Sequence, residues 1–201
     1  AVYEDYPAEA FYALMNLMGS HDVARAIYVL GGGSDTAERA EFGDYNEELG
    51  KQRLKLAALF EFGYAGAPTI YYGDEAGVVG FTDPDNRRTY PWGKENKELI
   101  KFHKEAIRIH KESEALRIGS LEIIGVKKGV LAYGRFTQED KVVVVVNHSD
   151  QPTTVNVPAW RIDVPRESVM NRLLYSNAEG YFVEPKEYPV KDGSFSLEMD
   201  K

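Results

Sequence analysis

Three acidic motifs contain the residue types that could act on a polar substrate. The first is Ser20-His21-Asp22, which lies between two apolar segments. A carboxylate fixed there could stabilise a transition state that develops positive charge. The same residues could instead cap the helix that follows, because Ser and Asp are favoured N-caps. The motif alone leaves both readings open.

The second motif is Asp-Pro-Asp-Asn-Arg-Arg at residues 83–88. Its candidate binding residues are Asp83 and Arg87, because a guanidinium offers a planar fork of hydrogen-bond donors. The alternative is a type I turn with Pro84 in its second position and solvated arginines, and both readings can hold together. The third motif, Asp74-Glu75, ends a predicted strand and could be taken for a catalytic pair, but we do not count these two residues among the catalytic candidates.

The first half of the chain predicts two strand–helix units that would position these motifs. Residues 8–17 indicate a helix, and residues 15–22 run like a strand to a polar end at His21-Asp22. Residues 67–77 indicate a fully buried parallel strand whose polar end is Asp74-Glu75. The long segment 76–93 is typical of a functional loop. Further helices are predicted over 23–30, 46–63 and 96–113, with a polar connection over 36–45. Leu99, Phe102, Ala106 and Ile109 would form the apolar face of the last helix.

The composition changes at residues 114–120 to short β-rich runs separated by Gly, Asp, Asn and Pro. The runs are 121–126, 129–136, 141–148 and 153–158. We therefore expect an α/β part over residues 1–115 and an antiparallel β-sandwich over 116–201. The last segment, 192–201, is strand-like with no closing turn, so the sandwich is expected to lack a terminal strand.

The composition excludes several classes of function. With 32 acidic against 24 basic residues the formal charge is -8, which disfavours nucleic acid and anionic membranes as partners. The absence of Cys removes disulfides and thiolate ligands but fits both a cytoplasmic and a secreted protein. No apolar run approaches the ~20 residues that a membrane span needs. We expect a soluble protein from a bacterium or archaeon, its compartment left open.

The remaining His and aromatic residues give weaker signals. His103 and His110 lie on a charged helix and His148 follows a strand, so we expect solvated histidines and no metal-ligand cluster. Four aromatic side chains could stack on sugar faces, although buried aromatics are more often core residues: Tyr71, Tyr72, Tyr90 and Trp92. Of these, Trp92 is the candidate for stacking.

The segments Asn-Leu-Met-Gly-Ser-His-Asp-Val-Ala-Arg and 66–92 together resemble the end of the barrel in glycoside hydrolase family 13, the α-amylases and neopullulanases. The resemblance implies strands seven and eight of a (β/α)8 barrel, their helices, and an all-β C-terminal domain. It implies that Asp22 is the third active-site acid and that His21, Asp83 and Arg87 bind the same glucose. In this family the Gly-Asp-Glu segment usually shapes the barrel mouth.

The same resemblance implies that two active-site groups are missing. Retaining glycosidases need a nucleophile and an acid/base about 5–5.5 Å apart, and the family takes them from strands four and five, which would precede residue 1. We therefore expect part of a larger enzyme that cleaves α-1,4-glucosidic bonds in starch, maltodextrin, pullulan or cyclodextrin. Its partners would be the α-glucan and the N-terminal remainder of the barrel, and this chain alone would be inactive.

The sequence leaves two alternative functions open. The chain could be a non-catalytic glucan-binding or scaffold module, or a hydrolase that uses Asp22 together with Glu75. The Gly-Ser-His-Asp form favours the neopullulanase-like branch of the family over the classical α-amylases. No cofactor is expected; calcium occurs in many relatives, but the chain contains no recognisable oxygen-ligand loop.

Overall fold

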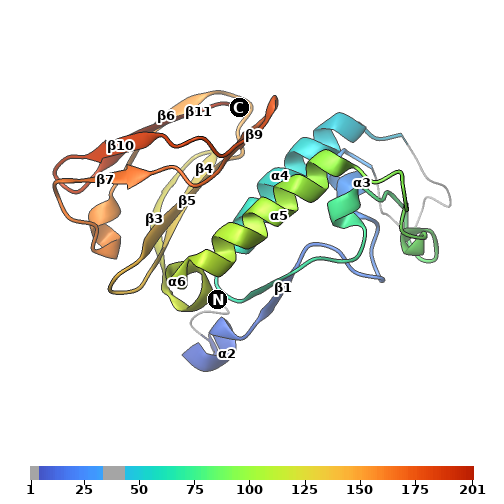
Figure 1. Ribbon diagram of the computed structural model, residues 1–201, viewed down its shortest axis with the longest axis horizontal. Coiled ribbons are helices and arrows are strands. Elements are labelled where there is room, and N and C mark those ends of the chain that lie inside the picture. The colour runs from blue at the N-terminus through green and yellow to red at the C-terminus, as the bar shows by residue number, and fades with distance from the viewer. Residues whose placement is uncertain (1–4, 34–43) are drawn as a thin grey trace.

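The computed structural model describes residues 5–33 and 44–201, apart from the side chain of Val126. Most of the polar connection predicted over 36–45 therefore lies outside the described residues. Figure 1 shows an antiparallel β-domain at one end, two long helices in the middle and a group of loops at the other end. We call residues 120–201 the β-domain and the residues before them the α/β part.

The α/β part contains two parallel strands, five α-helices and two 3-10 helices among its described residues. Its strands are β1 (Met15–Leu17) and β2 (Ala67–Thr69). Its helices are α2 (Ala8–Tyr12), α3 (Ala26–Leu30), α4 (Glu47–Gly63), η1 (Asp74–Ala76), η2 (Asp85–Arg87), α5 (Lys97–Glu112) and α6 (Glu114–Ile118). The helix predicted over 8–17 is shorter than expected, because its second half turns into β1. The predicted domain boundary between residues 115 and 116 falls within α6.

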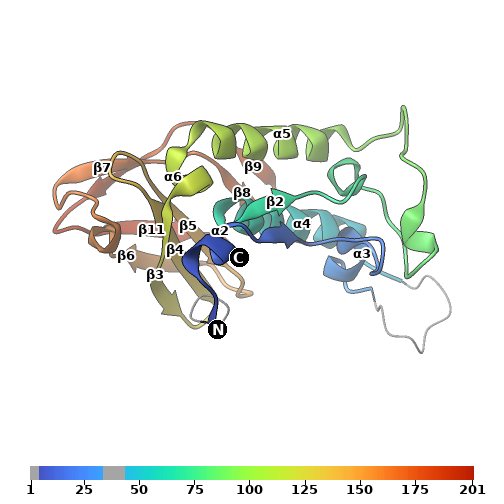
Figure 2. The same ribbon diagram turned by 90° about the horizontal axis from the view of Figure 1, so that it is seen from below.

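Strands β1 and β2 lie side by side and place both acidic loops at the same edge. Their register pairs Met15 with Ala67 and Leu17 with Thr69. Figures 1 and 2 show α4 and α5 on one side of this pair. The prediction of a fully buried second strand is wrong for this chain: Ala67 is exposed and the rest of β2 is half-buried. The physical reason is that, among the described residues, only β1 pairs with β2.

The two long helices pack through apolar faces and begin at matched caps. Asn46 and Asn96 each accept a hydrogen bond from a backbone N–H three residues later, at 2.9 and 3.0 Å. The predicted face of α5 is confirmed for Leu99, Phe102 and Ala106, which are buried. The expectation that His103 is solvated is wrong.

His103 is only 4% exposed, because it lies four residues after Leu99 and three before Ala106, on the buried face of α5. Its Nδ1 lies 2.8 Å from the Leu99 carbonyl oxygen. Burial lowers the pKa of His103. The imidazole is therefore a packed, uncharged side chain at neutral pH.

The β-domain confirms the predicted β-rich runs. A three-stranded antiparallel sheet has the order β3-β4-β5, and β6–β11, β7–β10 and β8–β9 pair antiparallel. The strands are β3 (Ser120–Lys127), β4 (Val130–Phe136), β5 (Lys141–Asn147), β6 (Thr153–Val157), β7 (Ser168–Asn171), β8 (Tyr175–Asn177), β9 (Gly180–Phe182), β10 (Glu187–Val190) and β11 (Phe195–Met199). A further 3-10 helix, η3, spans Ala159–Ile162. The core of the domain joins Ile124 and Ala132 of the first sheet to Val157, Val190 and Phe195.

The α/β part and the β-domain meet at the C-terminal end of α4. Arg135 of β4 is 1% exposed and donates to the carbonyl oxygens of Tyr64 at 2.7 Å, Gly63 at 3.3 Å and Gly119 at 2.9 Å. Tyr133 donates its hydroxyl to the Phe60 carbonyl at 2.8 Å. A cation at a helix C-terminus is favourable because unpaired carbonyls gather there. This junction holds the helix that covers β1 and β2.

Candidate active site

The loop after β1 presents His21 and Asp22 to solvent. The His21 Nε2 lies 3.2 Å from the Asp22 Oδ1, and the two side chains are 63% and 72% exposed. Ser20 accepts a hydrogen bond from the Asp22 backbone N–H at 3.2 Å. Helix α3 begins only at Ala26, and its N-cap residue Arg25 makes no side-chain cap. The reading of this motif as a helix cap is therefore wrong.

The loop after β2 contains the second acidic motif in and around η2. Arg87 Nε lies 2.8 Å from Asp83 Oδ1, and Arg88 Nε lies 2.8 Å from Asp85 Oδ1. The Asp83-Pro84 bond is cis. Although partial burial opposes it, hydrogen bonds from the Phe81 N–H and Arg88 lower the pKa of Asp85. The arginines of this motif are thus held in ion pairs and are not simply solvated.

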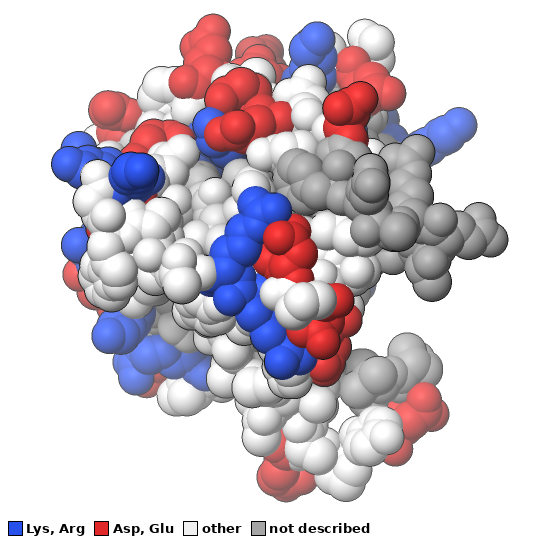
Figure 3. Space-filling view, turned by 90° about the vertical axis from the view of Figure 1, so that its right-hand side faces the viewer, with Lys and Arg blue, Asp and Glu red and all other residues white. Residues whose placement is uncertain are grey.

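The two loops are tied together at the predicted site residues. Arg87 Nε, besides contacting Asp83, lies 3.3 Å from the backbone oxygen of His21. Residues from loops more than 60 positions apart therefore meet at one place: His21, Asp22, Asp83 and Arg87. At the loop end of the molecule, a stripe of basic side chains lies directly beside acidic side chains (Figure 3).

Arg25 is a buried residue of this region that the sequence analysis did not single out. It is 1% exposed and donates to the backbone oxygens of Asn86 at 2.7 Å and Tyr72 at 2.5 Å. Its Nη1 also lies 3.1 Å from the Asp74 Oδ1. The available signal was an arginine within the apolar segment Val-Ala-Arg-Ala-Ile-Tyr, where a charge must find buried partners. Arg25 thus joins the loop after β1 to both halves of the loop after β2.

Asp74 and Glu75 have local structural contacts. Burial raises the pKa of Asp74 to about 6, although Arg25 opposes this. Gly19 has no side chain, and a Cβ atom built on its backbone would lie only 2.5 Å from the Asp74 Oδ2. The chain just after β1 therefore approaches this carboxylate closely. Glu75 accepts a hydrogen bond from the Gly73 backbone N–H at 2.8 Å. Both carboxyl groups therefore help to shape the loop that carries Asp83.

The aromatic residues divide into two groups. The rings of Tyr71 and Tyr72 lie 4.1 and 4.6 Å from the Arg25 guanidinium carbon, as cation–π contacts. Trp92 is 81% exposed and its ring lies 4.6 Å from that of Tyr90. The first pair therefore supports the buried arginine, while Trp92 has a surface open to a ligand.

Among the residues that the structure describes, no group of three or more His, Asp or Glu side chains is placed to hold a metal ion. Within the same residues, no helix combines the length and apolar character required to cross a bilayer.

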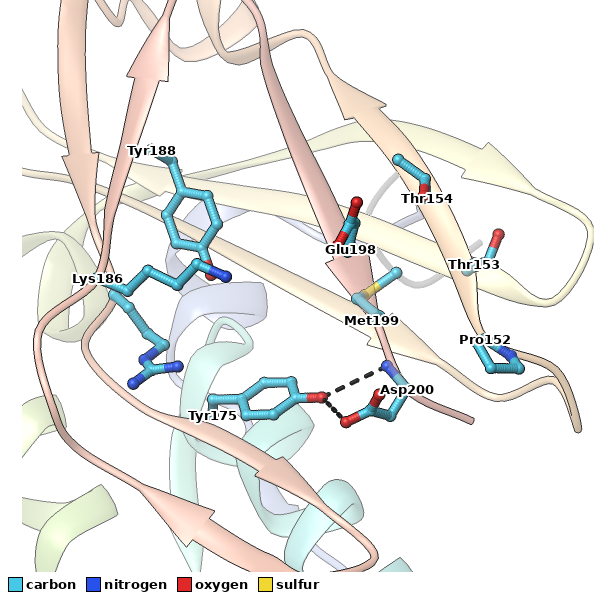
Figure 4. Close-up of a pocket in the computed structure, with 10 residues that line it drawn as sticks. Pro152, Thr153, Thr154, Tyr175, Lys186, Tyr188, Glu198, Met199 and Asp200 are labelled. Carbon is cyan, nitrogen blue, oxygen red and sulfur yellow. Dashed lines mark hydrogen bonds between the residues drawn. The ribbon is translucent and has the colours of Figure 1, made fainter.

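A groove of about 460 Å³ lies in the β-domain (Figure 4). It is lined by Pro152, Thr153, Thr154, Arg172, Tyr175, Lys186, Tyr188, Glu198, Met199 and Asp200. Several of its polar groups already bind one another: Tyr175 donates to the Asp200 carboxylate at 2.6 Å, and Arg172 donates to the Glu184 backbone oxygen. Lys186 lies over the ring of Tyr188. We interpret this groove as a polar corner of the domain.

Comparison with known proteins shows what the chain is similar to. Residues 121–188 match the family model described as Maltogenic Amylase, C-terminal domain. An amylopullulanase of Thermoanaerobacter thermohydrosulfuricus is 35% identical over 99% of this chain, which spans 13% of that relative. A cyclomaltodextrinase of Bacillus sp is 35% identical over 71% of this chain, with 23% of the relative covered.

The structural comparison shows a similar fold. The crystal structure of an alpha-amylase from Geobacillus thermoleovorans, complexed with acarbose, superposes with a TM-score of 0.73 at 22% identity. The match covers 94% of this chain and 37% of the amylase. Together the matches confirm the resemblance to the C-terminal portion of glycoside hydrolase family 13 enzymes. The chain spans well under half the length of each of these relatives.

Proposed function

We propose that this chain is the C-terminal part of a retaining α-glucan hydrolase and supplies one wall of its active site. In this proposal Asp22 stabilises the oxocarbenium-like transition state through hydrogen bonds to sugar hydroxyls that strengthen as charge develops. His21, Asp83 and Arg87 bind the same glucose unit. The observation that carries the proposal is the meeting of these four residues at one edge of a parallel strand pair. Such edges carry the catalytic groups of (β/α)8 barrels.

The exposed apolar side chains of β1 support a barrel as the parent fold. Met15 is 62% exposed and Leu17 is 46% exposed, while Asn16 between them donates to the Ala65 backbone oxygen. Parallel sheets are normally covered on both faces. We propose that the remaining strands of a (β/α)8 barrel cover Met15 and Leu17 and contribute the nucleophile and the acid/base. The residues described here would then have no hydrolytic activity alone.

The relatives' names suggest the substrate class. Relatives called amylopullulanase and cyclomaltodextrinase match the chain along most of its length, so we propose α-1,4-linked glucans, namely maltodextrin, pullulan or cyclodextrin, as substrates. The exposed Trp92 is placed to stack on a glucose ring. A purely glucan-binding role predicts binding without turnover and offers no use for a carboxylate beside His21.

The proposal is tested in the full-length protein with three substrates: maltodextrin, pullulan and a cyclodextrin. We expect hydrolysis of at least one of them, with retention of anomeric configuration by NMR, and a fall in kcat of about a hundredfold or more for Asp22→Asn. Asp150→Asn, an exposed aspartate in a turn of the β-domain, is the matched control and should retain wild-type kcat. Full activity of Asp22→Asn, or inversion of configuration, would contradict the proposal.

A further inference from the structure

Asn86 is a fully buried residue that touches the backbone on both sides of Asp22. Its side chain is 0% exposed. The amide Nδ2 donates to the backbone oxygen of His21 at 2.9 Å and to that of Val23 at 2.7 Å. A single side chain therefore brackets the residue that carries the proposed transition-state contact.

Only an amide group can make this pair of contacts with a side chain of this size. Both contacted atoms are carbonyl oxygens, so the group facing them must supply two donors and no acceptor. The NH2 of Asn meets that requirement, whereas the carboxylate of Asp would oppose two oxygens with a third. Residues 21–23 form a turn and bend, so side-chain bonds have a large share in fixing their carbonyls. The Asn86 contacts therefore orient the peptide units 21–22 and 23–24, which flank the backbone around Asp22.

The backbone of Asn86 is itself held in place. The buried Arg25 donates its Nε to the Asn86 backbone oxygen at 2.7 Å. A Cβ atom built on the backbone of Gly80 would lie only 2.8 Å from the Asn86 Cα, so the backbones of Gly80 and Asn86 are packed tightly together. Because the Asn86 backbone is fixed, its side chain can hold the loop after β1 in one position. The Asp22 side chain on that loop is 72% exposed and has little packing of its own.

We infer that Asn86 is a positioning residue for Asp22. This inference rests on the proposed function, because Asn86 can affect catalysis in this way only if the Asp22 carboxylate takes part in it. Displacement of a catalytic group by about 1 Å can cost about a hundredfold in rate. Loss of Asn86 should therefore lower kcat while KM, which depends on the wider sugar-binding surface, changes little.

The direct test is Asn86→Asp in the full-length protein. We expect kcat to fall about tenfold or more and KM to change less than about threefold. Asn147→Asp is the matched control, since the Asn147 amide also donates to two backbone oxygens, those of Gln151 at 2.9 Å and Asp200 at 2.7 Å, but in the β-domain. It should leave kcat unchanged. If Asn86→Asp fails to fold, Asn86→Ala removes the same donors without adding charge.

A double-mutant cycle with Asp22→Asn separates positioning from general damage. If Asn86 acts through Asp22, its substitution should have little further effect once Asp22 is already Asn. An equal fold-loss in both backgrounds, or a loss confined to KM, would overturn the inference while leaving the proposed function intact. If instead Asp22→Asn alone leaves kcat unchanged, the proposed function fails, and this role of Asn86 fails with it.

Discussion

Replacing Arg25 with Met tests the buried tie between the two loops. The guanidinium is fully buried and lies 3.1 Å from an Asp74 carboxylate that is only 7% exposed. It also supplies donors to the backbone oxygens of Asn86 and Tyr72. Methionine would fill similar space but would leave a buried carboxylate and two carbonyl oxygens without these donors.

The expected cost follows from the burial of the pair. Removing one partner of a buried ion pair costs about 3–5 kcal/mol, because the remaining charge is uncompensated. Each orphaned carbonyl adds about 1–3 kcal/mol unless water reaches it, so the total should be about 5 kcal/mol or more. Natural domains are stable by only about 5–15 kcal/mol. Arg25→Met should therefore remove a large part of the stability of this region.

The cost should also depend on pH. Burial raises the pKa of Asp74 to about 6 from 3.8 even with Arg25 present. Without Arg25 the pKa of Asp74 should rise further. Ionised Asp74 would then lower the free energy of unfolding near pH 7, and protonation near pH 5 would remove this cost. The difference between the variant and wild type should therefore shrink as the pH falls.

The assay is urea unfolding of the full-length protein, followed by circular dichroism near pH 7 and near pH 5. Arg108→Met is the matched control, because Arg108 is 50% exposed in its pairs with Glu105 and Glu112 and should cost about 1 kcal/mol or less. A cost for Arg25→Met that equals that of the control, or that is the same at both pH values, would refute the reasoning.

Two further changes test the domain junction and a second buried acid. Arg135→Met should loosen the end of α4, since the carbonyls of Gly63 and Tyr64 lose a charged donor worth about 1.5–3 kcal/mol; faster amide hydrogen exchange around residues 60–66 would show this, and unchanged exchange would contradict it. Burial raises the pKa of Glu61 to about 7 from 4.5. The folded state then binds more protons than the unfolded state between these values, so stability should fall as the pH rises through this window. Glu61→Gln should flatten that slope in urea unfolding, and an unchanged slope would place its origin elsewhere.

Much of the fold was predictable because its signals are local. The β-branched runs of β3 to β6 and the apolar spacing of α5 each reflect neighbours in the sequence. Strands β7 to β10 are only three or four residues long and were not identified individually. The burial of His103 was missed because its polar type was given more weight than its spacing, which is four residues after Leu99 and three before Ala106.

The residues of the candidate site could be predicted from the sequence, but the buried residues that hold its loops in place could not. His21, Asp22, Asp83 and Arg87 occur in recognisable motifs, and the structure brings them together. Their catalytic and binding roles stay predictions. Arg25 and Asn86 act through contacts that span about 60 residues of sequence. Such contacts depend on how β1 and β2 align, which no local pattern specifies.

The proposed role of Asp22 is to stabilise the transition state of glucan hydrolysis. The most direct test measures, for Asp22→Asn in the full-length protein, both the single-turnover hydrolysis rate and the Kd for a maltooligosaccharide. We predict that the rate falls about a hundredfold or more while the Kd changes only a few-fold, because the Asp22 contacts strengthen in the transition state. An unchanged rate, or a loss of affinity as large as the loss of rate, would contradict the claim.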